Sequence, residues 1–123
     1  MGTQSMPRHV VRDKSFAFAL RIVNLCRSLA EERREFVLSR QLLRSGTAIG
    51  ALVREAEQAE SRADFVHKMS IALKEANETQ YWIDLLHQAD YIDGRGFTSI
   101  QATNTELLKL LTAIVKTTKT RRY

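Results

Sequence analysis

Two short motifs in the sequence pair an aspartate with a histidine at helical spacing. Asp64 and His67 form one Asp-x-x-His motif, and Asp84 and His87 form the second. A di-metal helical bundle needs an acid-x-x-His motif on two different helices and a glutamate from each of two others. Here both motifs fall in one continuous helical pattern, so they are separated by about 30 Å and cannot share an ion. The remaining set of Asp84, His87 and Asp90 favours a solvated polar surface, and we expect no metal and no cofactor.

A set of charged residues in the middle of the chain is a second place to look for acid–base chemistry. A catalytic pair needs a pocket and a nucleophile or metal beside it. The sequence supplies neither, and it has no phosphate-binding glycine loop, Ser-His-Asp set or zinc-ligand spacing, so we predict a protein that is not an enzyme. We expect these charges to form ion pairs between helices or between subunits, which fix the register of packing. The set comprises Arg44, Arg54, Glu55, Lys74, Glu75 and Glu78.

Length and composition are those of an ordinary globular chain. The 123 residues predict a single domain spanning 1–123, and 44% of them are hydrophobic. The one cysteine, Cys26, excludes an internal disulfide, and its apolar surroundings in the sequence favour a buried thiol over a nucleophile. No apolar run approaches the 18 or so residues that a membrane span needs, and the N-terminal residues lack the apolar core of a signal peptide. We therefore expect a cytoplasmic protein with no membrane partner.

Four amphipathic segments account for nearly all of the chain. Apolar residues recur every three or four positions, the sequence has a single proline, and no segment alternates with the period of a strand. With short connections, this pattern predicts an all-α protein, an antiparallel up-down-up-down four-helix bundle. The expected helices span about 13–33, 40–59, 62–91 and 99–118.

Residue types at the ends of these segments predict where the helices begin and stop. Ser39 is the expected N-cap of the second helix, and Ser61 with Asp64 resembles a capping box at the start of the third. The run Asp-Gly-Arg-Gly at 93–96 favours a turn that ends the third helix. The candidate N-caps of the fourth helix are Thr98 and Ser99.

The apolar residues of each segment predict which side is buried. The first segment carries two adjacent stripes, which predict a wide buried face. One stripe comprises Phe16, Leu20, Val23, Cys26 and Ala30, and the other comprises Phe18, Ile22, Leu25 and Leu29. The expected inner residues of the third segment are Phe65, Met69, Ala72, Ala76, Ile83 and Leu86. Those of the fourth segment are Leu107, Leu108, Leu111, Ile114 and Val115.

Two glycines, Gly46 and Gly50, lie in the middle of the second expected helix. Each costs a helix about 1 kcal/mol relative to alanine. Because they are four residues apart, they lie on the same side of the helix and let another helix approach closely, which adds contacts that offset this cost. A kink is the alternative. The apolar periodicity continues through to Ala59 and favours close packing.

Positive charge gathers at the two ends of the chain. The net charge is +5: residues 1–34 hold seven basic and three acidic residues, residues 116–123 hold four basic and none acidic, and residues 35–115 hold eight basic and eleven acidic. An up-down-up-down bundle brings the start of its first helix and the end of its fourth to the same end, where clustered cations would bind nucleic-acid phosphates. The candidate nucleic-acid-binding residues are Arg8, Arg12, Lys14, Lys116, Lys119, Arg121 and Arg122.

An alternative for these basic ends stays open. The turn between the second and third helices falls at the same end and carries Glu57, Glu60 and Asp64, so local pairing would neutralise part of the charge. Solvated basic tails are also common. Stacking of bases has little support, because Tyr123 is the only aromatic residue at the C-terminal end.

Three short motifs in the sequence nearly match a pattern that is shared by the members of one protein family. The pattern reads Arg-Ser-x-x-Ser-Ile-x-x-Asn-x-x-Glu, then Ser-x-x-Asp-Phe, then Lys-Glu-x-x-Glu-x-x-Tyr-Trp. The matching residues are Arg44, Ser45, Ala48, Ile49, Leu52 and Glu55, then Ser61, Asp64 and Phe65, then Lys74, Glu75, Glu78, Tyr81 and Trp82. With residues 14–29 and 38–86 as a whole, they resemble the bacterial 23S rRNA intervening-sequence family, also labelled S23 ribosomal protein. Ala48 and Leu52 stand where the family usually has Ser and Asn, so we expect no role that depends on those two polar side chains in this protein.

The resemblance implies an antiparallel four-helix bundle that assembles into a homopentamer. A related branch, the accessory proteins of diversity-generating retroelements, binds nucleic acid and a reverse transcriptase, whereas most of the family has no assigned activity. We therefore expect a non-enzymatic, oligomeric bundle whose partners are further copies of itself and RNA, DNA or a nucleic-acid-handling protein. The alternative is a protein-interaction scaffold that binds no nucleic acid. Gly46 and Gly50 would serve helix packing in either case.

Overall fold

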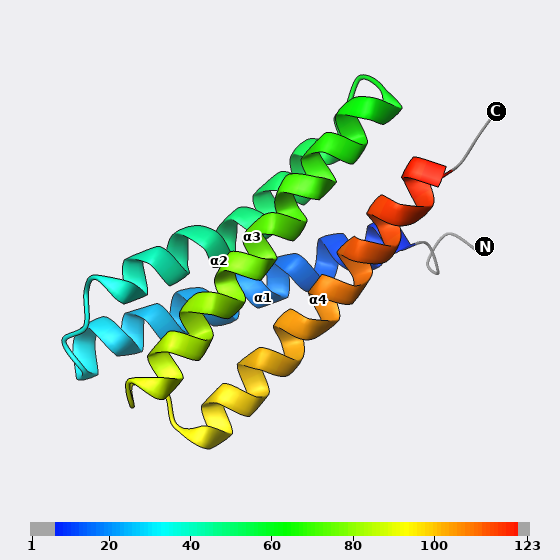
Figure 1. Ribbon diagram of the computed structural model, residues 1–123. Helices are drawn as coiled ribbons and strands as arrows, with labels where there is room; N and C mark the ends of the chain where they lie inside the picture. The colour runs from blue at the N-terminus through cyan, green and yellow to red at the C-terminus, as the bar shows by residue number, and fades with distance from the viewer. Residues whose placement is uncertain (1–6, 121–123) are drawn as a thin grey trace.

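Four long helices make up the protein, as the apolar periodicity predicts. The computed structural model describes the backbone of residues 7–120 and the side chains of residues 9–120. The helices are α1 (Pro7–Glu32), α2 (Leu38–Ala56), α3 (Arg62–Gln88) and α4 (Gly94–Thr120), and the chain between Pro7 and Thr120 contains no strand. The all-α fold class is confirmed, and Figure 1 shows the antiparallel course of consecutive helices.

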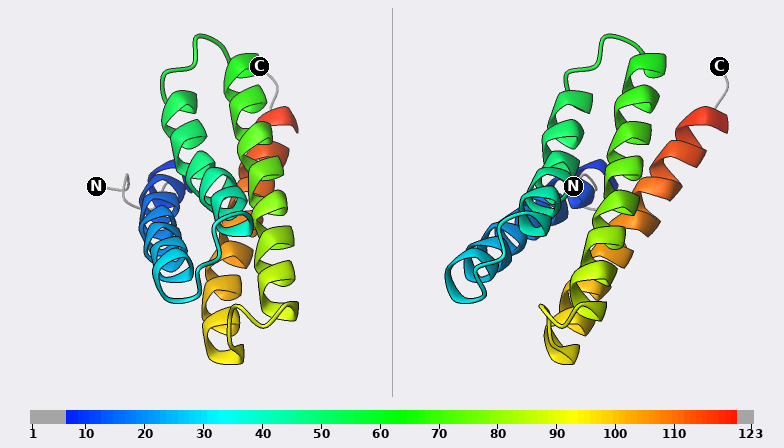
Figure 2. Two further views of the ribbon diagram at one scale, coloured as in Figure 1. Left: turned by 90° about the vertical axis from the view of Figure 1, so that its left-hand side faces the viewer. Right: turned by 60° about the vertical axis from the view of Figure 1, so that its left-hand side comes forward.

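Each helix packs against two neighbours. α2 lies between α1 and α3, and α4 packs on both α3 and α1, so α1 and α3, like α2 and α4, lie diagonally across the bundle. The α1–α4 contact is the smallest of the four. Figures 1 and 2 show why, because α1 runs obliquely to α4 while α3 and α4 run side by side. The start of α1 and the end of α4 lie toward the same end of the bundle, as the topology predicts.

The core is formed by one side of each helix. Phe18 and Ile22 of α1 and Leu42 and Ile49 of α2 are fully buried members of one apolar cluster. The expected inner residues of α3 are all buried. On α4, Leu107, Leu111, Ile114 and Val115 are buried as predicted, and Leu108 is half-buried at the edge of the cluster.

The prediction of a wide buried face on α1 is wrong for two large residues. Phe16 is 52% exposed and Leu20 is 53% exposed. Each lies two positions from the buried Phe18, which is about 160° around the helix. A helix at the corner of a bundle buries only the side that meets its two neighbours, so these two residues remain outside, whereas Cys26 of the same stripe is buried.

Gly46 and Gly50 lie where α2 crosses α1. A Cβ atom on Gly46 would come within 2.9 Å of both Cγ1 and Cγ2 of Ile22, which is too close for carbon atoms. A Cβ on Gly50 would lie 3.4 Å from the backbone oxygen of Ser15, which is an ordinary contact. α2 remains one continuous α-helix through both glycines. The close approach of two helices therefore depends mainly on Gly46.

The start of α2 is capped by Glu35 and not by Ser39. The Glu35 carboxylate accepts hydrogen bonds from the backbone N–H groups of Val37, Leu38 and Ser39 at 3.2, 3.0 and 2.7 Å. Ser39 already lies inside the helix, where its hydroxyl donates to the backbone oxygen of Glu35 at 2.8 Å. Burial raises the pKa of Glu35, but the hydrogen bonds from the three N–H groups and from the Ser39 hydroxyl outweigh it and leave that pKa below its usual value.

The start of α3 is the capping box that the sequence predicts. The Ser61 hydroxyl accepts a hydrogen bond from the Asp64 N–H at 3.0 Å, and the Asp64 carboxylate accepts one from the Glu60 N–H at 3.3 Å. The first bond satisfies a helix N–H as in a capping box, whereas the second goes to Glu60, one residue before the N-cap Ser61.

The turn between α3 and α4 falls earlier than expected. α3 ends at Gln88, Asp90 takes a left-handed conformation with φ 68°, and the Tyr91 N–H donates to the Leu86 carbonyl at 2.8 Å. The run 93–96 is therefore not the turn: its glycines lie in the first turn of α4. The Asp93 carboxylate accepts a hydrogen bond from the Gly96 N–H at 2.7 Å, at the start of α4. Because α4 begins at Gly94, Thr98 and Ser99 lie inside the helix and are not its caps.

We predict opposite effects for the two glycine-to-alanine substitutions. Gly46→Ala inserts a methyl group into Ile22 and should lower the free energy of unfolding by about 1–3 kcal/mol, as overpacking does. Gly50→Ala meets no such obstacle and should be neutral or raise it by up to about 1 kcal/mol through helix propensity. Urea unfolding of the two matched variants measures the difference. Equal effects at the two positions would contradict the close-packing explanation.

We predict that Glu35→Gln weakens the fold in a pH-dependent way. The folded-state pKa of Glu35 is lowered, so its stabilisation is fully present above the ordinary glutamate pKa of about 4.3 and disappears as the pH falls through the lowered value. At neutral pH the variant should lose about 1–2 kcal/mol, because the N–H groups lose a charged acceptor. Urea unfolding from pH 7 down to pH 3 should show the two proteins converging. Glu32→Gln, at an exposed position, serves as the control and should show no such convergence.

Candidate functional site

The basic end of the bundle holds part of the predicted nucleic-acid-binding set. Lys116 and Lys119 are exposed in the last turns of α4, and Arg12 and Lys14 lie near the start of α1. The topology brings these two helix ends together at one end of the bundle (Figure 1). The side chain of Arg8 and residues Arg121 and Arg122 lie outside the described residues.

Acidic neighbours pair with the basic residues of α1. Arg12 lies 3.8 Å from Glu57 at the end of α2 and 3.6 Å from Asp13. Lys14 forms an ion pair with Glu106 of α4 at 3.0 Å. In the part of the chain that the structure describes, Lys116 and Lys119 form no ion pair. The α4 end therefore supplies the positive charge that remains available to a polyanion, and that of α1 is mostly paired.

A hollow of about 590 Å³ opens beside this end, between the start of α1 and the turn joining α2 to α3. Its apolar wall includes Val11, Phe65 and Met69, all buried, and its rim includes Arg12 and Glu57. The Arg12–Glu57 ion pair thus spans the rim. Periodicity did not single out this place, because it is formed by a helix start and an inter-helix turn that are far apart in the sequence.

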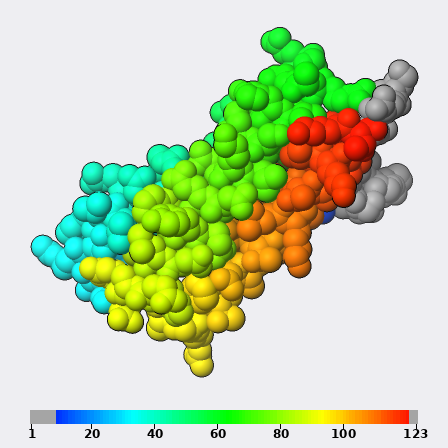
Figure 3. All heavy atoms as spheres, viewed as in Figure 1, coloured from blue at the N-terminus to red at the C-terminus, as the bar shows by residue number. Residues whose placement is uncertain are grey.

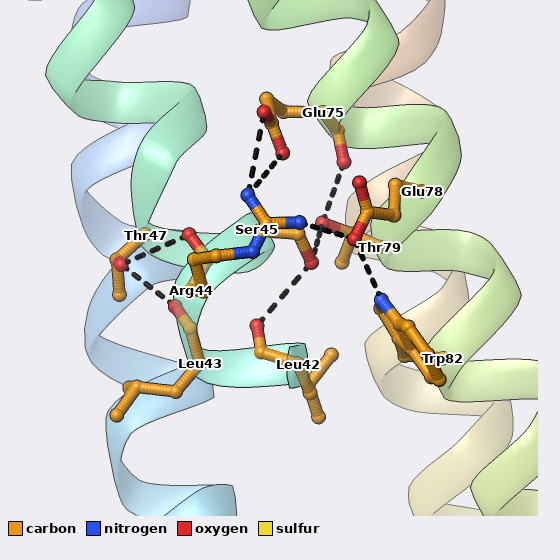
Figure 4. Close-up of polar contacts among 9 residues, drawn as sticks. All are labelled: Leu42, Leu43, Arg44, Ser45, Thr47, Glu75, Glu78, Thr79 and Trp82. Atoms are coloured by element: carbon orange, nitrogen blue, oxygen red, sulfur yellow. Dashed lines mark hydrogen bonds and ion pairs between the residues drawn. The ribbon is translucent and has the colours of Figure 1, made fainter. Parts of the chain in front are cut away.

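The charged set of the middle of the chain forms a network between α2 and α3. The Arg44 guanidinium of α2 lies 3.3 Å from Glu75 and also contacts Glu78, both on α3 (Figure 4). The indole N–H of Trp82 donates to the same Glu78 carboxylate at 2.9 Å. The hydrogen bond from Trp82, followed by that from Arg44, lowers the pKa of Glu78. Glu78 thus remains ionised and joins the two helices.

The other members of the set lie apart from this network. Glu55 pairs with Lys68 of α3 at 3.2 Å, a partner that the sequence analysis did not include. The Arg54 guanidinium lies 5.3 Å from the centre of the Phe16 ring, a cation–π contact between α2 and α1. Lys74 is exposed, and among residues 9–120 it forms no ion pair.

The histidine motifs and the cysteine show no arrangement for chemistry. His87 stacks on the Phe97 ring with centroids 4.0 Å apart, and Asp84 accepts a hydrogen bond from Gln80 at 2.9 Å. No three His, Cys, Asp or Glu side chains in the described region are placed to hold a metal ion. Burial, followed by the charge of Glu35, raises the pKa of the Cys26 thiol to about 12. Cys26 is thus a buried packing residue whose thiol donates to the Ser39 carbonyl at 3.2 Å.

Comparison with known proteins gives a family. The family model described as the 23S rRNA-intervening sequence protein matches residues 8–113. The chain belongs to the 23S rRNA-intervening sequence protein family. A crystal structure of a protein of unknown function from the S23 ribosomal protein family of Bacteroides thetaiotaomicron is 58% identical, covers 90% of this chain and 99% of its own, and superposes with a TM-score of 0.89. No curated protein matches the chain.

The family assignment agrees with the fold and leaves activity open. No helix within residues 7–120 has the length and apolar character that crossing a bilayer requires. The matched region includes the Arg44–Glu75–Glu78 network and the glycine contact. In this member of the family, the relation to retroelement accessory proteins stays a prediction.

We predict a measurable coupling between Arg44 and Glu78. In a double-mutant cycle with Arg44→Met and Glu78→Gln, the coupling should be about 0.5–1 kcal/mol, since the pair is half exposed but shares a network with Trp82. Urea unfolding followed by the fluorescence of Trp82, the only tryptophan, measures it. A cycle of Lys109→Met, on α4, with Glu78→Gln is the control and should show no coupling. Equal coupling in both cycles would contradict the network.

Proposed function

We propose that this protein is a non-enzymatic helical scaffold that self-associates and binds RNA or DNA through its basic end. The observation that carries the nucleic-acid part is the pair of exposed lysines, Lys116 and Lys119, at the end of the bundle where α1 begins. Cations in such an arrangement bind phosphates without reading the sequence, and the affinity falls as salt rises. The description of its family also names a ribosomal RNA segment.

Self-association is supported by the apolar side chains that the single bundle leaves outside. Phe16, Leu20 and Tyr81 are each more than half exposed. Phe16 and Leu20 lie four residues apart on one side of α1, whereas Tyr81 is on α3. Large apolar residues grouped on a surface, as on α1, mark sites of protein contact. A homopentamer is the assembly implied by the family resemblance, and in such a ring every copy would present its basic end in an equivalent position. Weak phosphate contacts would then act together.

A protein-interaction scaffold without nucleic-acid binding is the second candidate. It is favoured by the ion pairs of Arg12 with Glu57 and of Lys14 with Glu106, which neutralise the α1 side of the basic end. Docking of a nucleic-acid-handling protein would combine the two candidates. The dependence of binding on salt separates phosphate contacts from apolar docking, which salt does not weaken in this way.

We predict that the two lysines of α4 carry salt-sensitive binding. Wild-type protein of verified size should bind mixed RNA or DNA fragments at about 50 mM salt and lose most of that affinity at about 200 mM. The double variant Lys116→Gln/Lys119→Gln should weaken binding several-fold and reduce the salt slope by about one for each lysine that contacts a phosphate. Fluorescence anisotropy at several salt concentrations measures both.

The matched control is Lys74→Gln/Lys109→Gln, which removes the same charge from exposed positions elsewhere. Substitution is preferable to removing residues 116–123, because Thr118 is buried and its hydroxyl donates to the Ile114 carbonyl at 2.7 Å. Equal losses in the two double variants would show a general charge effect and overturn the assignment to the basic end. No binding at 50 mM salt would leave the protein-interaction scaffold as the function.

A further inference from the structure

The hollow at the basic end has an apolar floor and a polar mouth. Val11, Val53 and Met69 line the floor, and each has 2% or less of its surface exposed. The volume of about 590 Å³ falls in the range of about 300–1,000 Å³ that ligand sites have in proteins. The hollow lies where the end of α2 and the start of α3 project beyond the start of the oblique α1 (Figures 1 and 2). The residues of the mouth are His9, Arg12, Glu57, Gln58, Ser61 and Arg62.

Two charged side chains at the mouth keep their capacity for hydrogen bonds. The Arg12 guanidinium lies 3.8 Å from the Glu57 carboxylate and 3.6 Å from that of Asp13, and neither distance is that of a hydrogen bond. The side chains of Arg12 and Glu57 are 40% and 29% exposed, so a ligand can reach both. The mouth therefore offers donors and an acceptor side by side. This mixture suits the edge of a nucleobase, which carries donors and acceptors, better than it suits a phosphate.

The two exposed lysines of α4 lie close to this hollow. Asn104 of α4 donates a hydrogen bond to the Ala76 carbonyl of α3 at 3.0 Å, which fixes the register of these antiparallel helices. Because both helices rise by the same amount per residue, Lys116 and Lys119 lie level with the start of α3, which lines the mouth. Figure 3 shows the end of α4 directly against the start of α3. A strand whose phosphates contact these lysines can therefore bring a neighbouring base to the hollow.

An unstacked nucleobase has the chemistry that this site requires. Its two faces are apolar, and its edge carries hydrogen-bond donors and acceptors. Bases in single strands and loops turn out of the stack and enter protein pockets, whereas those of a duplex are paired and stacked. A ligand without phosphates would use the hollow but leave the two lysines without a role. The occupant that uses both features is a base on a strand.

We propose that the hollow binds one unstacked base of a single-stranded or looped nucleic acid whose phosphates contact Lys116 and Lys119. The inference rests on the proposed nucleic-acid binding and names the form of nucleic acid that the basic end prefers. The base lies against the apolar floor, with its edge at Arg12 and Glu57. Salt weakens the phosphate contacts and has little effect on the apolar contacts of the base.

Two strands of equal length and charge test the proposal on the wild-type protein. One is a single-stranded DNA of mixed sequence, and the other is abasic at every position, so that it presents the same phosphates without bases. Fluorescence anisotropy at about 50 mM salt measures both affinities. The intact strand should bind about tenfold more tightly, an effect of the size that stacking one base on a protein gives.

Filling the hollow tests whether the bases bind there. Ala59 lines the hollow and packs against the core, and Ala59→Leu fills part of the space without adding charge or an aromatic ring. This variant should bind the intact strand as weakly as the abasic one and keep the wild-type affinity for the abasic strand and for a duplex. Gln58→Leu repeats the test at an exposed position of the mouth. Ala102→Leu, exposed on α4, should behave as the wild type, and thermal melting checks that all three fold.

The outcomes separate this inference from the function on which it rests. A wild type that binds neither strand at 50 mM salt overturns the proposed nucleic-acid binding, and the base site with it. Equal affinities of the wild type for the two strands overturn the base site only and leave phosphate binding in place. A preference for the intact strand that persists in both mouth variants also overturns it, because the bases are then bound elsewhere. Equal losses for the intact strand, the abasic strand and the duplex in these variants overturn it as well.

Discussion

The close approach of α2 to α1 at Gly46 is the contact on which the rest of the arrangement depends. With no side chain at this position, the α2 backbone lies against Ile22, where even a methyl group would come within 2.9 Å. The two preceding residues then face α3: the Ser45 hydroxyl meets that of Thr79 at 2.9 Å, and Arg44 meets Glu75 and Glu78. Three consecutive residues, Arg44, Ser45 and Gly46, thus join α2 to both of its neighbours. Gly46 allows α2 to lie close to α1, and the charge of Arg44 fixes the register of α2 against α3.

The same contact decides which parts of α1 are left outside. Because α2 lies on the Ile22 side of α1, Phe16 and Leu20 on the other side of the helix face solvent. Arg54 of α2 lies over the Phe16 ring and partly covers it. The exposed apolar surface therefore results from helix packing, and a second copy can bury it without any change in the bundle. An apolar side left over in this way is a natural place for assembly.

The spacing of apolar residues was enough to predict the fold class and the buried sides of α3 and α4, because each of those helices has one clear apolar stripe. It failed on α1, which has two stripes, because periodicity does not say on which side a neighbouring helix packs. Ser39 is a reasonable cap by residue type, but the helix begins before it, and Glu35 accepts from the N–H groups of Val37, Leu38 and Ser39 itself. The Glu55–Lys68 pair and the hollow at the basic end both join residues from different elements, and their contacts exist only once the helices are placed.

The charges of a single bundle connect the two parts of the proposed function, assembly and nucleic-acid binding. In one bundle, Glu57 and Glu106 pair with the basic residues of α1, so the described part of the basic end has two unpaired lysines. Two phosphate contacts give little affinity at physiological salt. In the proposed function, a cyclic assembly would repeat the same end around one axis, and the contacts of all copies would then act on one polyanion. On the proposed function, the bundle would gain affinity for nucleic acid by assembling, because each further copy would add the same phosphate contacts.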